Sequence, residues 1–129
     1  MAELVTPDKR YKEIRNILKG YLKKWRSRLG LDYWNITSNW VWANKKDIGE
    51  YRAVGGETKT LWPYLTATID FYLPDLVYCD DDELEEMAVH ELTHVLVAEA
   101  MEQDGMCTPN QERVVTELAR AFLRVDRSK

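Results

Sequence analysis

The feature that most constrains this fold is a long apolar segment that should form a buried helix over residues 82–101. Its apolar residues fall on almost every side of a helical wheel, a pattern typical of a helix enclosed by other elements. These residues are Met87, Ala88, Val89, Leu92, Val95, Leu96, Val97 and Ala98. The four acids Asp80–Glu83 precede them and should supply an N-cap at the positive end of the helix dipole. A calcium site is the alternative for these acids, but their spacing does not match an EF-hand loop.

The same segment contains both histidines of the chain, in the sequence His90-Glu91-Leu92-Thr93-His94. Residues i and i+4 lie on one face of a helix, so the two imidazoles can share a zinc ion. Glu91 lies one position round and can reach a water on that ion as a general base. The alternative is a pair of structural histidines, but burying them with a carboxylate and no metal would be costly.

A catalytic zinc takes three protein ligands, and this chain has no third histidine. Glu99 points about 140° away from His94 on the same helix, and Glu102 lies about 12 Å along its axis. Asp104 falls in the expected turn. The remaining acids, Glu112 and Glu117, lie on a final helix that should fold back antiparallel.

Helical spacing favours Glu112 as the third ligand. Glu112 lies beside Ala119 and Leu123 at the border of the expected buried face. Glu117 falls among arginines on the solvent side. Two alternatives stay open: Glu112 could be a first-turn acid that only favours the helix dipole, and Cys107 could bind zinc from the loop.

Two further helices have clear start and stop signals. Thr6 and Pro7 are typical of an N-cap and first position, and Gly30 should end this first helix. Apolar residues recur at spacings of three and four: Tyr11, Ile14, Leu18, Tyr21, Leu22, Trp25 and Leu29. Thr108 begins a capping box that starts the final helix, which should end near Asp126.

The region between the first helix and the motif helix should supply three strands. Residues 35–43 are rich in aromatic and β-branched residues, and a short strand near residues 51–54 should follow them. Residues 64–73 alternate strictly between apolar and polar positions, and we expect this strand to form an edge that can pair with a peptide. We therefore predict one α+β domain over residues 1–129: an N-terminal helix, a small, mostly antiparallel three-stranded sheet, the buried motif helix and a C-terminal helix.

Composition restricts the classes that remain. The chain is 45% hydrophobic and 31% charged, as in soluble globular proteins. It has no apolar run long enough to span a membrane and no recognisable signal peptide, so we expect a cytoplasmic protein. Cys79 and Cys107 are too few for a disulfide framework and should be free thiols.

Charge is unevenly distributed along the chain. Residues 1–30 hold nine Lys and Arg against three Asp and Glu, and the remainder holds nine against nineteen. We interpret this as a solvated basic helix on an acidic body. Nucleic-acid binding by residues 9–28 is a weaker alternative, because no reading motif accompanies the charge.

The motif with a glutamate on the next helix resembles the gluzincins, zinc peptidases of the thermolysin type. The short span from the motif to the glutamate and the small size of the chain look most like the minigluzincins and related phage and prophage metallopeptidases. The resemblance covers roughly residues 64–125 and implies Zn²⁺ held by His90, His94 and Glu112, with Glu91 activating water. Thermolysin-type enzymes also carry an aspartate four residues after the glutamate ligand, where this chain has Thr116.

The expected function is therefore hydrolysis of a peptide or protein substrate. An oxyanion needs an additional donor, and Tyr51, Tyr64, Tyr72 and Tyr78 are the candidates. The alternative function is a zinc-binding relative without activity that serves as a phage interaction or regulatory module. The sequence does not indicate the substrate or the oligomeric state.

Overall fold

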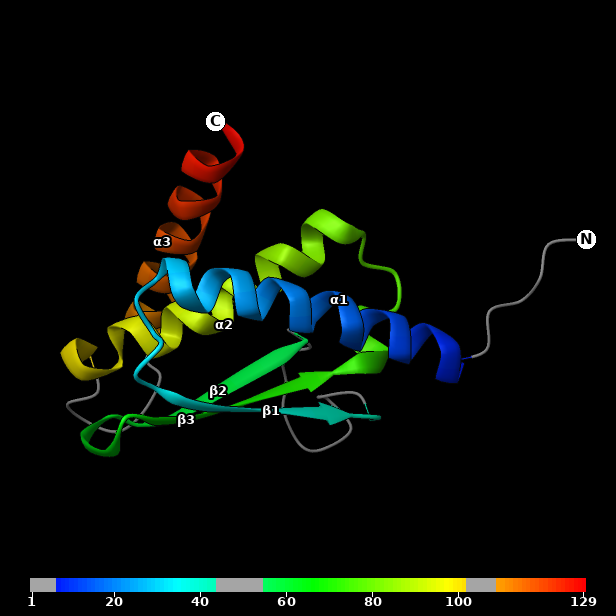
Figure 1. Cartoon of the computed structure of the whole chain (residues 1–129), viewed down its shortest axis with the longest axis horizontal. Coiled ribbons are helices and arrows are strands. Elements are labelled where there is room, and N and C mark those ends of the chain that lie inside the picture. The colour runs from blue at the N-terminus through cyan, green and yellow to red at the C-terminus, as the bar shows by residue number, and fades with distance from the viewer. Residues whose placement is uncertain (1–6, 44–54, 102–108) are drawn as a thin grey trace, which may run out of the picture.

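The computed structural model describes residues 7–43, 55–101 and 109–129. The elements, in chain order, are α1 (Pro7–Arg28), β1 (Asn35–Val41), β2 (Gly56–Leu61), η2 (Trp62–Tyr64), β3 (Thr66–Tyr72), η3 (Leu73–Leu76), α2 (Asp81–Met101) and α3 (Pro109–Arg127). This confirms the α+β class and the order of helix, sheet and two helices. Figure 1 shows the three α-helices on one side of the sheet. No helix among the described residues combines the length and hydropathy needed to cross a bilayer.

The sheet is mixed, with strand order β1-β3-β2. β2 and β3 form an antiparallel hairpin joined by η2, whereas β1 pairs with β3 in parallel. The expectation of a mostly antiparallel sheet was therefore wrong for β1. The expectation that the strand near residues 64–73 forms an edge was also wrong, because β3 is paired on both sides.

The second described strand begins at Gly56, the second residue of the glycine pair. The strand expected at residues 51–54 lies outside the described residues, and β2 runs from Gly56 to Leu61. Gly55 turns the chain into β2 with φ of +75°, where a Cβ atom would lie 2.6 Å from the Leu76 side chain. A residue other than glycine would therefore be both strained and obstructed.

The core lies between the inner face of the sheet and the helices. Ala67, Ile69 and Phe71 alternate along β3 and are fully buried. Ile14 and Leu18 of α1 pack into the same cluster, as the apolar stripe predicted. The α2 residues that complete it are Leu84, Ala88, Val89, Leu92 and Val95. The motif helix is therefore central, as its apolar sequence indicated.

A capping box fixes the start of α2. The Glu83 backbone N–H donates to the Asp80 carboxylate at 2.8 Å, and the Asp80 N–H donates to the Glu83 carboxylate at 3.2 Å. The expected N-cap is thus confirmed, and these two carboxylates are engaged with the backbone. Among the described residues, the acids at the start of α2 do not form a group that could hold a metal ion. The caps expected at Thr6 and Thr108 lie outside the described residues.

Candidate metal centre

His90 and His94 lie on one face of α2, one helical turn apart. Their ring centroids are 5.0 Å apart, and the ring planes meet at 73°. The side chains retain 22% and 11% of their exposure, so both rings are mostly buried yet reachable from solvent. The i, i+4 spacing therefore produces the expected pair of converging imidazoles.

Glu112 of α3 completes a group of three possible ligands. Its Oε1 lies 2.8 Å from His90 Nε2, and its Oε2 lies 3.2 Å from His94 Nε2. One ligand atom from each residue can be chosen so that all lie within 4.8 Å of one another. The group could hold a metal ion. The structure thus brings together the three residues that the sequence singled out.

The packing of α3 explains why Glu112 reaches α2. Val115, Ala119 and Leu123 form the buried stripe of this helix, and Glu112 lies next to that stripe. Glu117 is exposed, as expected. Of the alternatives, Glu99 is also exposed, whereas Glu102, Asp104 and Cys107 lie outside the described residues.

Electrostatics couple the three side chains tightly. The hydrogen bond with His90, and then the one with His94, holds the pKa of Glu112 well below its ordinary value. Burial by itself lowers the pKa of His90, but the hydrogen bond with Glu112 and the negative charge of Glu91 outweigh burial and raise it. The cluster thus favours positive charge between the imidazoles and the carboxylate, which a proton or a metal ion can supply.

The Glu91 side chain contacts β2. This side chain is 3% exposed, and Thr58 Oγ1 donates to its Oε1 at 2.7 Å. A Cβ atom at Gly56 would lie 3.2 Å from Glu91 Oε2, so the glycine leaves room beside this oxygen. Sequence reasoning missed Thr58, although the β-branched Thr58 and Thr60 are typical of a strand.

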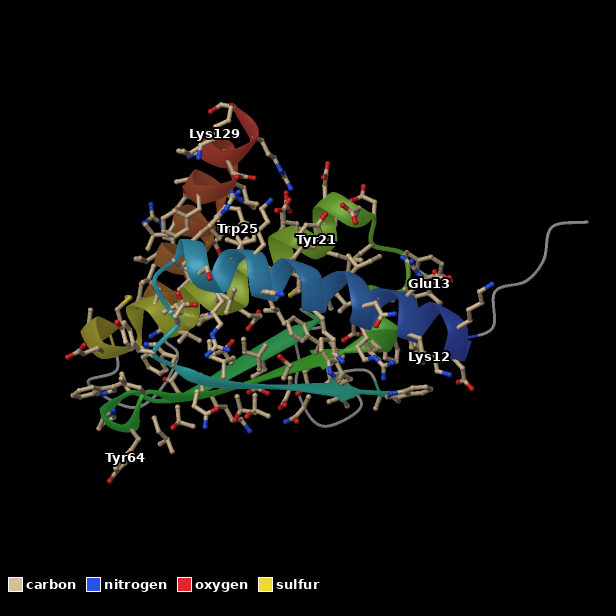
Figure 2. All side chains as sticks on the ribbon, viewed as in Figure 1. Lys12, Glu13, Tyr21, Trp25, Tyr64 and Lys129 are labelled. Atoms are coloured by element: carbon tan, nitrogen blue, oxygen red, sulfur yellow. The ribbon has the colours of Figure 1, made fainter. Side chains whose placement is uncertain are left out.

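The structure separates the tyrosine candidates by exposure. Tyr72 is buried and its hydroxyl donates to Glu57 at 3.2 Å. Tyr64 and Tyr78 are 79% and 97% exposed, and Tyr64 projects away from the body of the protein (Figure 2). Tyr51 lies outside the described residues. The role of one of these tyrosines in stabilising an oxyanion stays a prediction.

Thr116 stands where the resemblance would require an aspartate. It lies one turn after Glu112 in α3, and its side chain forms no hydrogen bond with any other described residue. The carboxylate that commonly orients a metal-bound imidazole is therefore not replaced by a hydrogen bond from this threonine.

The ligand set fits zinc. Two imidazoles and one carboxylate form a common catalytic zinc site, which leaves a fourth position for water. Donors bound tetrahedrally at zinc distances lie about 3.3 Å apart. The Glu112 oxygens lie at comparable distances of 2.8 and 3.2 Å from the imidazole nitrogens. Comparison with protein-family models, curated proteins and solved structures finds no match for this chain.

Proposed function

We propose that this chain is a small zinc-dependent metallopeptidase. The observation that carries the proposal is the convergence of His90, His94 and Glu112, with Glu91 next to the first ligand in sequence. When bound, zinc supplies Lewis acidity and lowers the pKa of a water molecule. The resemblance to gluzincins agrees with this ligand set and with the role given to Glu91.

Glu91 is the general base of the proposed reaction. It accepts a proton from the attacking water and later passes that proton to the leaving amine. Thr58 occupies Oε1, so we assign the proton transfer to Oε2, which faces the space beside Gly56. The Thr58 hydroxyl therefore orients the carboxylate in this proposal.

The substrate should bind as an extended strand along β2. This strand is an edge among the described strands, and it lies against the Glu91 side chain. A peptide that pairs with the outer edge of β2 would form main-chain hydrogen bonds and pass close to the base. The sequence had suggested the strand that is now β3 as the peptide-binding edge. Because β3 is the central strand, the peptide is assigned to β2 instead.

Substitution of Glu91 tests the mechanism. Glu91→Gln should retain stoichiometric zinc and lose peptide hydrolysis by about 10²- to 10⁴-fold. Glu99→Gln, an exposed change on the same helix, is the matched control and should keep full activity. Turnover of a mixed peptide library by mass spectrometry, with and without a chelator, provides the measurement. Equal rates for Glu91→Gln and the parent would contradict the mechanism.

A second candidate is a zinc-binding module that does not hydrolyse peptides. The burial of Glu91 at 3% exposure and its hydrogen bond with Thr58 favour this reading, because a base must meet water. In that case the parent protein would bind one zinc ion and cleave no member of the peptide library. The same assay therefore separates the two candidates.

A further inference from the structure

A groove of about 630 Å³ lies between α1 and β1, along the sheet edge opposite β2. Figure 1 shows α1 extending along β1, with the two elements running in opposite directions. The apolar lining of the groove comes from α1, β1 and α2: Leu22, Ile36, Trp40 and Leu92. Lys19, Lys23 and Arg26 line the α1 side. The groove therefore combines an apolar floor with a cationic rim.

The charge of the groove is not neutralised by its surroundings. The side chains of Lys19 and Lys23 form no ion pair or hydrogen bond with any described residue, whereas Lys24, on another face of α1, pairs with acids of α2 and α3. Asp32 is the one acid among the described residues that line the groove, and it accepts a hydrogen bond from Ser27 at 3.2 Å. Three cations against one carboxylate leave a positive surplus that an acidic partner can satisfy.

β1 adds a second feature to the groove. Among the described strands it pairs only with β3, so its other edge carries backbone groups available to a further strand. Ile36, Ser38 and Trp40 point into the groove from alternate positions of β1. A strand added at this edge would direct every second side chain toward α1.

We propose that this groove binds an extended peptide segment that carries acidic residues at alternate positions and adds to β1 as a strand. Lys19 and Lys23 are one helical turn apart, about 6 Å along the helix axis. Alternate residues of a strand are about 6.6 Å apart, so two acids at positions i and i+2 match both lysines. A third inward residue of apolar character would meet the floor at Trp40.

A peptide fits these observations better than a nucleic acid does. A phosphate backbone lacks the alternating N–H and C=O groups that would pair with the edge of β1. Trp40 is stacked on Phe71 at a centroid distance of 5.3 Å, so this ring already has an aromatic partner. The proposal goes beyond the peptidase function, because the groove lies on the opposite edge of the sheet from β2 and needs no metal.

Fluorescence anisotropy with a labelled peptide tests the proposal on the full chain. The probe is acetylated Thr-Glu-Thr-Glu-Thr-Leu, and the control is Glu-Glu-Thr-Thr-Thr-Leu, which has the same composition with its acids adjacent. The probe should bind, and the control should bind at least about tenfold more weakly. Both affinities should be unchanged after chelation of metal.

Charge-reversal variants locate the binding surface. Lys19→Glu with Lys23→Glu should weaken probe binding about tenfold or more. Arg124→Glu with Lys129→Glu makes the same change in net charge at exposed sites near the C-terminal end of α3 and should alter affinity less than twofold. Circular dichroism should show that both double variants keep the parental fold. Equal losses in the two variants would overturn the location.

Backbone methylation tests strand addition. Methyl groups on the amide nitrogens of the Thr residues or of the Glu and Leu residues block opposite edges of the peptide. One set should abolish binding, and the other should leave it within a few-fold. The proposal is overturned if both sets bind equally, if the adjacent-acid control matches the probe, if an oligonucleotide binds more tightly than the probe, or if the probe does not bind at 1 mM.

Discussion

Two carboxylates join α2 to α3, and the groups that balance their charges differ in kind. Glu85, near the start of α2, is 5% exposed and accepts hydrogen bonds from Lys24 Nζ at 2.9 Å and Trp25 Nε1 at 2.8 Å. Arg127 of α3 approaches its other oxygen at 3.4 Å. Glu112, near the start of α3, is met instead by the imidazoles of His90 and His94.

The difference shows which cluster is complete and which can accept an ion. Lysine and arginine carry their charge at any physiological pH, so the Glu85 cluster is balanced by the chain itself. A histidine, unlike lysine or arginine, can release its proton near neutral pH and then offers a lone pair to a metal. The Glu112 cluster also retains solvent access, with 35% of its carboxylate side chain exposed. We therefore interpret Glu85 as a structural group and Glu112 as a ligand.

Removal of the structural carboxylate should have the largest effect on stability. Glu85→Ala leaves Lys24, Trp25 and Arg127 without their shared acceptor, and the free energy of unfolding should fall by about 3–5 kcal/mol. Chemical denaturation measures this loss, which should be the same with and without zinc. A loss that zinc restores would mean that the two clusters are not independent.

Zinc should stabilise the protein through the other cluster alone. At a free concentration 1,000 times its Kd, an ion that binds only the folded state adds about 4 kcal/mol. Glu112→Gln should remove most of this gain, and it should also lower the stability of the chelated protein somewhat, because the ionised carboxylate no longer pairs with the imidazoles. Thermal denaturation with zinc and with chelator measures both quantities. A full zinc effect in Glu112→Gln would contradict the role of Glu112 as a ligand.

Lowering the pH should reduce the stability that the Glu85 cluster contributes. Burial alone raises the pKa of Glu85, but hydrogen bonds from Trp25 and Lys24 outweigh burial and lower it below its ordinary value. Its contribution is then present above the unfolded pKa of about 4.3 and is lost as pH falls through the lower, folded pKa. Glu85→Gln should flatten the loss of stability below pH 5 in urea titrations. An unchanged acid slope would contradict this.

The smallest effect should come from the more open ion pairs beside Glu85. Asp126 pairs with Lys24 and with Arg28, whose side chains are 34% and 45% exposed. Asp126→Asn should cost only about 0.2–1 kcal/mol, because solvent screens such pairs. Salt should reduce this difference in denaturation experiments. A loss as large as that of Glu85→Ala would show that the two acids act as one network.

The elements that local patterns determine were predictable from the sequence. Helical spacing predicted the apolar stripe of α1 and the i, i+4 histidines. A helix start signal predicted the role of the acids before α2. Placing Glu112 beside Ala119 and Leu123 on the helical wheel also selected the acid that meets the histidines.

Features that depend on long-range pairing were not predictable. β2 contains a single apolar residue, Leu61, so no hydrophobic alternation marks it. The parallel partner of β1 depends on which edge of the β2–β3 hairpin it joins, and sequence spacing does not specify this. The contact of Thr58 with Glu91 and that of Trp25 with Glu85 span 33 and 60 residues and arise only from packing.

X-ray absorption spectroscopy at the zinc edge, combined with elemental analysis, tests the central claim most directly. The account predicts one zinc ion per chain, with nitrogen and oxygen ligands at about 2.0–2.1 Å that include two imidazoles. Glu112→Gln should change this spectrum, and Glu117→Gln should not. A parent protein without bound zinc in excess zinc, or a spectrum insensitive to Glu112→Gln, would contradict the account.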